Sequence, residues 1–397
     1  MSELLYYLTP TPASVPIVTR GNAFYRDGER FFVKGISYIP RRPDAERFDR
    51  AATLDPLTSD RVEGLEQDIA RLHELGLNSI SVQNLDPSKD HAKALRLLEK
   101  EGIYVVVTIC DTIEAPHLRS TTLPGYNNDF DTTPHYSRHM IRKTLALVDQ
   151  LAAHPNILGF TVSGDSVNTP SVTKIAEVAC IRDIKHFLHL RRGRRVPVGV
   201  SAPDRLTLRL AHLQYFAAGE PSERADYFAP ACWSWAGQSS FQVSGWKHMV
   251  EAFGRASPIP MFLNGYGTNL VKPRGWSEVL CLHSPDMTGV FSGGFTYTFF
   301  DYAKTGYGVL ALGEDGQRVK QQDFYSLEKT FRAVNVRLPE EVATAEGRDY
   351  EVWKGQFPPQ QHNHTTWSAT SELPPFPGDW TEVLQDLTDR RDPEIVT

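Results

Sequence analysis

Acidic and amide residues follow apolar runs at several points along this chain. Asp165 comes just after "NILGFTVS", Asp301 comes after "FTYTFF", and Gln83 and Asn84 come after "LNSISV". A carboxyl group among apolar neighbours has a raised pKa and can act as a general acid or base near neutral pH. Asp165 and Asp301 are therefore strand-end carboxylates that could do such chemistry, although Asp301 is more simply explained as a loop or helix-capping residue.

Aromatic residues occur at comparable positions, and Gly265, in "PMFLNGYGTN" (260–269), lies among them. Aromatic rings can stack on the faces of sugar rings or shape a pocket for a hydrophobic ligand, and the sequence does not choose between these uses. A place in the core is the alternative for any one of these rings, such as Phe299. The candidate pocket residues are Tyr38, Gln83, Asn84, Trp233, Trp235, Gly265, Tyr266, Tyr297 and Asp301.

These positions fall at the ends of predicted strands that alternate with helices. The predicted strands cover 30–38, 77–85, 103–110, 156–163, 196–201, 225–233, 259–264 and 289–299. The predicted helices cover 59–76, 88–102, 136–153, 170–190, 203–216, 244–254, 275–283 and 322–334. Eight such pairs predict a (β/α)8 TIM barrel, an α/β fold whose chemistry lies at the C-terminal ends of the strands. A doubly wound sheet is the alternative, but no GxGxxG motif follows the first strand.

The length of 397 residues accommodates one large barrel with extensions. We predict an N-terminal segment at 1–29, a barrel at 30–334 and a C-terminal extension rich in proline, glycine, glutamine and histidine at 335–397. The extension either wraps the barrel or is partly disordered.

Composition limits the partners. A net charge of −6 argues against a nucleic-acid surface, and no run of 18 apolar residues predicts a membrane span. His, Asp and Glu show no metal-ligand spacing, and the "HNH" at 362–364 is interpreted as polar linker. We expect no metal and no nucleotide cofactor. The expected partner is a small molecule bound in the barrel mouth, either a hydrophobic metabolite or an oligosaccharide.

Several segments resemble one family in its own order along the chain. They include "FFVKGISY", "HPNILGFTVSGDSVN", "ADYFAPACWSWAGQSSFQVSGW", "IPMFLNGYGTN" and "VFSGGFTYTFFDYAKTGYGVL". Together they are similar to the fungal β-1,3-glucanosyltransferases of glycoside hydrolase family 72 over about residues 30 to 332. The resemblance implies a glycoside-hydrolase barrel that acts on β-1,3-glucan.

The resemblance also marks departures. Where the family has the nucleophilic Glu of "SEYG", this chain has Gly265, and where the family has its acid/base Glu, this chain has Asp165 after Gly164. Ser81 and Gln83 stand in the place of an Arg and a Tyr. Retaining glycoside chemistry needs two carboxyl groups about 5 to 5.5 Å apart, and a glycine cannot supply one. For this chain to perform that chemistry, Asp111 or Asp301 would have to take the place of the missing carboxyl group.

The chain ends and cysteines point to a cytoplasmic location. The N-terminus lacks a basic region before its apolar residues, and the C-terminus lacks the apolar tail of a lipid anchor. Where the resemblance implies disulfides, the chain has Ala236 with Thr268 and Leu65 with Ala94. Loss of both bridges is expected of a protein in a reducing compartment.

Three functions follow as hypotheses. The first is an intracellular enzyme that acts on a small molecule other than a sugar, by isomerisation, cyclisation, dehydration or cycloaddition in a specialised-metabolite pathway, with Asp165 as acid/base and His248 and His283 as weaker candidates. The second is a non-catalytic binder of glucan or of a protein. The third is residual β-1,3-glucan transglycosylation.

Overall fold

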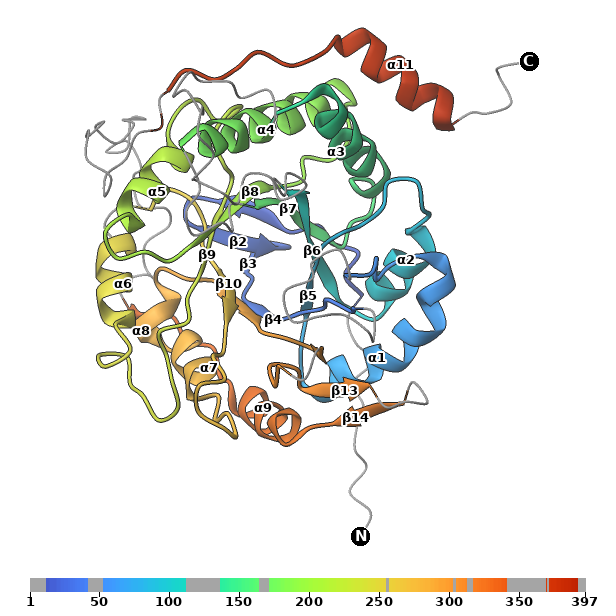
Figure 1. Ribbon diagram of the computed structural model, residues 1–397. Helices are drawn as coiled ribbons and strands as arrows, with labels where there is room; N and C mark the ends of the chain where they lie inside the picture. Colours follow the sequence, from blue (N-terminus) through green and yellow to red (C-terminus); the bar gives the residue numbers. More distant parts are fainter. Residues whose placement is uncertain are drawn as a thin grey trace, which may run out of the picture.

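A closed barrel of parallel strands forms the centre of the molecule (Figure 1). The computed structural model describes residues 12–41, 53–111, 136–163, 171–254, 257–302, 305–312, 317–340, 369 and 371–391. The barrel strands are β4 (Val33–Ser37), β5 (Ser79–Val82), β6 (Tyr104–Asp111), β7 (Ile157–Ser163), β8 (Val198–Pro203), β9 (Phe228–Ala231), β10 (Leu263–Tyr266) and β11 (Gly293–Thr296). They pair in chain order, and β11 closes the ring against β4. The predicted (β/α)8 fold is confirmed, and the doubly wound alternative is excluded.

Helices surround the barrel, as Figure 1 shows. They are α1 (Val62–Glu74), α2 (Ala92–Lys100), α3 (Arg138–Leu151), α4 (Ser171–Leu190), α5 (Arg209–Ala217), α6 (Trp246–Gly254), α7 (Ser277–Leu282), α8 (Pro285–Thr288) and α9 (Gln322–Ala333). A 3-10 turn, η2 (Ser59–Arg61), precedes α1. Leu65, Ile69 and Leu72 of α1 are buried, as their helical spacing predicts.

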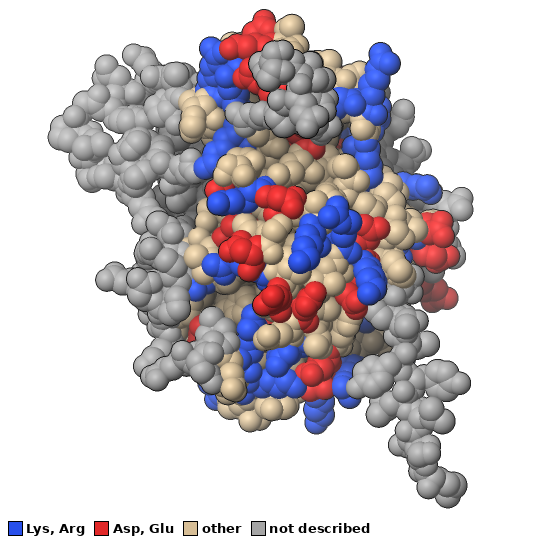
Figure 2. Space-filling view, turned by 90° about the vertical axis from the view of Figure 1, so that its right-hand side faces the viewer, with Lys and Arg blue, Asp and Glu red and all other residues tan. Residues whose placement is uncertain are grey.

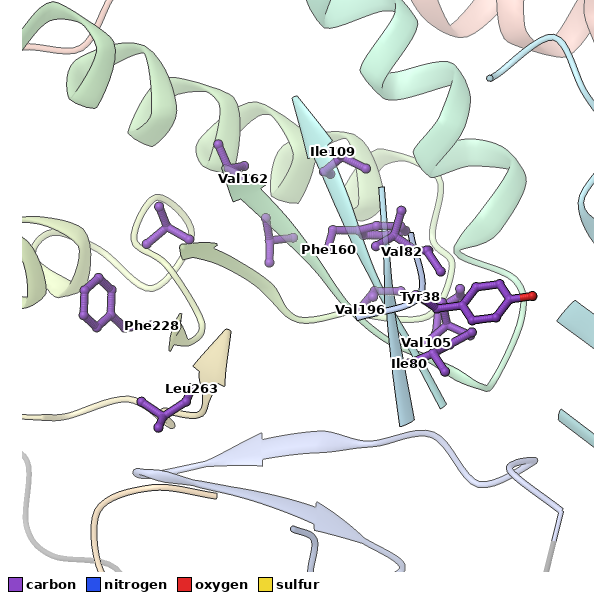
Figure 3. Packing of buried hydrophobic residues seen from close by; sticks show 14 of the residues in the cluster. Tyr38, Ile80, Val82, Val105, Ile109, Phe160, Val162, Val196, Phe228 and Leu263 are labelled. Carbon is purple, nitrogen blue, oxygen red and sulfur yellow. The ribbon is translucent and has the colours of Figure 1, made fainter. Parts of the chain in front are cut away.

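The strands are held by apolar side chains packed beneath the helices. Figure 3 shows part of this core, to which Ile80, Val105, Phe160 and Leu263 contribute. β6 reads "YVVVTICD" because both faces of a parallel strand are covered, which favours a continuous β-branched run over an alternating one. The core therefore fixes the strand ends, where the candidate site lies.

A small antiparallel sheet closes the N-terminal end of the barrel. It consists of β1 (Val18–Arg20), β2 (Ala23–Arg26) and β3 (Glu29–Arg30). The ring of Phe24 packs 5.8 Å from Tyr227 and 5.9 Å from Phe262, centroid to centroid, inside a second apolar cluster. The sequence did not predict these strands.

A further sheet of three short strands joins the barrel to α9. It comprises β12 (Phe300–Asp301), β13 (Leu310–Leu312) and β14 (Arg318–Lys320). Its first strand directly follows the loop after β11, so it extends the C-terminal end of the barrel.

The described part of the C-terminal extension includes a helix, α11 (Trp380–Arg391), which lies along the outside of α3 and α4 (Figure 1). Arg142 forms ion pairs with Glu382 and Asp386, both at 3.0 Å, and Trp380 packs edge-on against His186. These contacts agree with an extension that wraps the barrel. The predicted boundaries at 29 and 334 remain predictions.

Charges of both signs are interspersed on the face seen in Figure 2. None of the helices in the described ranges is both long enough and apolar enough to cross a bilayer.

Candidate functional site

Gly265 lies in β10 at the C-terminal end of the barrel and pairs with Ala231 of β9. A Cβ atom placed on Gly265 would lie 3.1 Å from Cζ2 and 3.3 Å from Cη2 of Trp233. These separations are shorter than an ordinary van der Waals contact between carbon atoms. The indole of Trp233 therefore fills the space that a side chain at position 265 would need.

Trp233 belongs to a cluster that we call the aromatic platform, formed by Trp233, Tyr297 and Tyr307. The Trp233 ring lies edge-to-face with Tyr297 at 5.5 Å and with Tyr307 at 6.2 Å, and the two tyrosine rings are 5.4 Å apart. Such edge-to-face contacts are favourable because the positive edge of one ring meets the negative face of another. The two tyrosines are half-buried, whereas Trp233 is 41% exposed. The platform thus offers an exposed indole held by two partly buried rings.

A polar chain extends the platform on one side. The hydroxyl of Tyr297 is hydrogen-bonded to that of Tyr302, and the guanidinium of Arg41 lies 3.9 Å from the centroid of the Tyr302 ring. A cation over a ring face is attracted by the ring quadrupole. Sequence reasoning missed Tyr302 and Tyr307, although both lie in the "FFDYAKTGYGVL" part of a segment that carries the resemblance.

Arg274 holds the loops that carry the two platform tyrosines. Its guanidinium donates to the backbone oxygens of Tyr297 at 2.7 Å and Tyr307 at 2.6 Å, and to that of Gly267 at 3.2 Å. Its Nε donates to Asp323 Oδ2 at 2.7 Å, and its backbone N–H donates to Oδ1 of the same carboxylate at 3.0 Å. Burial lowers the pKa of Arg274, and the Asp323 carboxylate opposes this shift. Neither residue was predicted, because the pairing joins positions far apart in sequence.

The carboxylate of Asp301 is engaged in its own loop. Its Oδ1 accepts hydrogen bonds from Thr305 Oγ1 at 3.1 Å, Gly306 N at 2.9 Å and Gly308 N at 3.3 Å. These bonds agree with the loop-capping interpretation. Asp204, which follows β8, is similarly committed, because Arg209 binds both of its oxygens at 2.7 Å.

Three predicted pocket aromatics are buried. Tyr38 is 3% exposed, and its hydroxyl donates to Asp68 of α1 at 2.7 Å; Figure 3 shows this hydroxyl directed away from the core cluster. Trp235 is 5% exposed and donates from Nε1 to Ser277 Oγ at 3.1 Å, and Tyr266 is fully buried. These rings support the wall of the barrel, and the structure does not bring them to the platform. Phe299 also lies in the core, as its alternative interpretation held.

The two predicted amides lie at the end of β5. Gln83 is half-buried, whereas Asn84 is exposed, has a φ of 62° and donates from Nδ2 to the backbone oxygen of Thr53 at 2.6 Å. Asparagine tolerates this left-handed conformation better than most residues. Asn84 therefore shapes the turn after β5.

The candidate acid/base, Asp165, lies outside the described residues, as do Gly164 and the side chain of Asp111. His248 is exposed on α6 beside Glu251, whereas His283 is buried and donates from Nδ1 to the backbone oxygen of Val279 at 2.8 Å. Burial lowers the pKa of His283, which favours its neutral form. Neither histidine contacts the aromatic platform.

Glu278 of α7 is buried at 4% exposure, and burial raises the pKa of its carboxyl to about 7, against a smaller opposing effect of Arg274. Burial and the nearby Asp204 raise the pKa of the Cys232 thiol, so it stays protonated at neutral pH. No cluster of three or more metal-ligating side chains occurs within the residues that the structure describes.

Solved and curated proteins resemble this chain over most of its length. The structure of Saccharomyces cerevisiae Gas2p in complex with laminaripentaose matches with a TM-score of 0.76 and 28% identity, covering 93% of this chain and 79% of that one. The 1,3-beta-glucanosyltransferase gel1 of Aspergillus fumigatus is 35% identical over 319 residues, which cover 80% of this chain and 65% of the relative. The 1,3-beta-glucanosyltransferase GAS5 of S. cerevisiae is 30% identical over 369 residues, covering 91% of this chain and 70% of the relative.

These relatives correct two expectations. The first hypothesis, an intracellular enzyme for a non-sugar small molecule, is wrong, because gel1 and GAS5 are both named 1,3-beta-glucanosyltransferases. The predicted cytoplasmic location is also wrong, because it conflicts with the kind of protein that these 1,3-beta-glucanosyltransferase relatives are. The absence of cysteines at these positions was therefore a poor guide to location; Leu65 and Ala94 are both buried in the core.

A family model described as glucanosyltransferase matches residues 9–335. The match includes the whole barrel and extends into the N-terminal sheet that closes it. The chain therefore belongs to the glucanosyltransferases of glycoside hydrolase family 72.

Proposed function

We propose that this chain acts on β-1,3-glucan, and that the glucan lies across the C-terminal ends of the barrel strands. The observation that carries the proposal is the exposed aromatic platform at that end, in a barrel whose relative Gas2p was solved with laminaripentaose. Sugar rings present apolar faces that stack on aromatic rings, and their hydroxyl groups bind to polar atoms at the rim.

The reaction for which the relatives are named is transfer of a glucan segment. A retaining transfer needs a nucleophile and an acid/base, and Gly265 has no side chain to act as either. Of the described carboxylates near the strand ends, Asp301 and Asp204 are held by their own hydrogen bonds. The described residues therefore support glucan binding more directly than they support the covalent step, for which Asp165 is the remaining candidate acid/base.

Calorimetry with laminarihexaose, a linear β-1,3-glucan, tests the proposal, and cellohexaose with β-1,4 linkages is the matched control. We expect heat of binding with laminarihexaose and less or none with cellohexaose. Mass spectrometry of the same mixture reports longer oligosaccharides if the chain transfers glucan. Absence of both binding and longer products would overturn the proposal.

A further inference from the structure

We propose that Trp233 is the residue that holds the glucan in this chain. Its indole, which lies next to Gly265, stacks on one glucosyl unit. The inference rests on the proposed function and names the contact that performs it. Gly265 and Trp233 act together in this proposal: because Gly265 has no side chain, the indole of Trp233 can occupy the volume beside β10.

The first argument is steric. With no side chain at Gly265, the indole lies against β10, and Ala231 beneath it is also small: a Cβ on Gly265 would lie 3.9 Å from the Cβ of Ala231. The Cβ of a glutamate at position 265 would lie closer to Cζ2 and Cη2 of Trp233 than an ordinary van der Waals contact allows. A side chain at position 265 would therefore require the indole to move from its present position.

The second argument is orientation. Trp233 is held edge-to-face by Tyr297 and Tyr307, and the backbone of both tyrosines is fixed by Arg274. A ring fixed before binding loses little conformational freedom when a ligand stacks on it. Trp233 nevertheless remains 41% exposed, so part of its surface is open to a ligand.

Binding of laminarihexaose to Trp233→Ala, Trp233→Phe and the wild type separates the inference from the proposed function. We expect Trp233→Ala to weaken binding about tenfold or more and Trp233→Phe to weaken it less, because a single stacked ring contributes on the order of one such factor. Tyr325→Ala, which removes a 52% exposed ring on α9, is the control and should bind as the wild type does.

A second variant tests the steric argument. Gly265→Ala places a methyl group against the indole, and because Trp233 is partly exposed the ring can shift, so the chain should fold while binding weakens. Tryptophan fluorescence should change on addition of laminarihexaose in the wild type and not in Trp233→Phe.

The outcomes are distinct. If the wild type binds and Trp233→Ala binds equally well, the stacking inference is wrong while the proposed function stands. If the folded wild type binds no β-1,3-glucan, both are wrong.

Discussion

The Arg274–Asp323 pair is expected to couple the stability of the chain to the shape of its platform. Arg274 is 3% exposed, and its guanidinium contacts one carboxylate and three backbone oxygens that belong to the loops after β10, β11 and β12. Replacing Asp323 with asparagine keeps the shape of the side chain and removes its charge. Replacing Arg274 with lysine keeps the charge but loses the planar fork that reaches several acceptors at once.

The magnitudes follow from burial. Removing one partner of a buried ion pair costs about 3 to 5 kcal/mol, because the other charge is left uncompensated. Asp323→Asn retains an oxygen for the backbone N–H of Arg274, so we expect a cost at the lower end of this range, about 3 kcal/mol. Because total stabilities are about 5 to 15 kcal/mol, this variant should still fold.

Urea denaturation of Asp323→Asn, Arg274→Lys and the double variant provides the measurement. We expect a coupling energy of about 1 to 3 kcal/mol in the double-mutant cycle, and weaker laminarihexaose binding in every variant. Glu74→Gln, which breaks the partly exposed Lys320–Glu74 pair, is the control and should cost less than about 1 kcal/mol. Additive single effects, or wild-type binding by Arg274→Lys, would refute this account of the pair.

Three further predictions concern residues around the site. Burial raises the pKa of Glu278 from 4.5 to about 7, so the folded state keeps this proton at pH values where the unfolded state has lost it. The free energy of unfolding should therefore fall by up to about 3 kcal/mol as pH rises from 4.5 to 7. Denaturation curves at several pH values should show that Glu278→Gln removes this decline, whereas Glu66→Gln, a change at an exposed residue, keeps it. Tyr38→Phe deletes the hydroxyl that binds the buried Asp68 and should cost about 1 to 3 kcal/mol with no change in glucan binding; a loss of binding at wild-type stability would contradict the supporting role. Gly294→Ala places a Cβ 2.5 Å from a backbone oxygen of β10 and should lower the thermal midpoint by several degrees, and an unchanged midpoint would show that the strands can separate freely.

Much of the fold could be predicted because its signals are local. The β-branched run of β6 and the helical spacing of Leu65, Ile69 and Leu72 each follow from neighbouring residues that must face a common core. The N-terminal sheet escaped prediction, since β1 to β3 are two to four residues long and gain their stability from packing against the barrel end.

The strand ends were located from sequence, but the direction of each side chain was not. Tyr38 and Tyr266 lie at strand ends as predicted, and both are buried in the wall, because a residue at the end of a strand can face either the barrel axis or the helices. The 41% exposed ring of Trp233 takes its position from packing with Tyr297 and Tyr307, which come from other loops.

By itself, the sequence determined the barrel, its family resemblance and the absence of a carboxylate at Gly265, because these depend on residue identity and order. Tertiary structure alone decided that the indole of Trp233 fills the space beside that glycine and that Arg274 fixes the surrounding loops. Such contacts join residues from different strands and loops, and their distances depend on how the closed barrel brings those elements together.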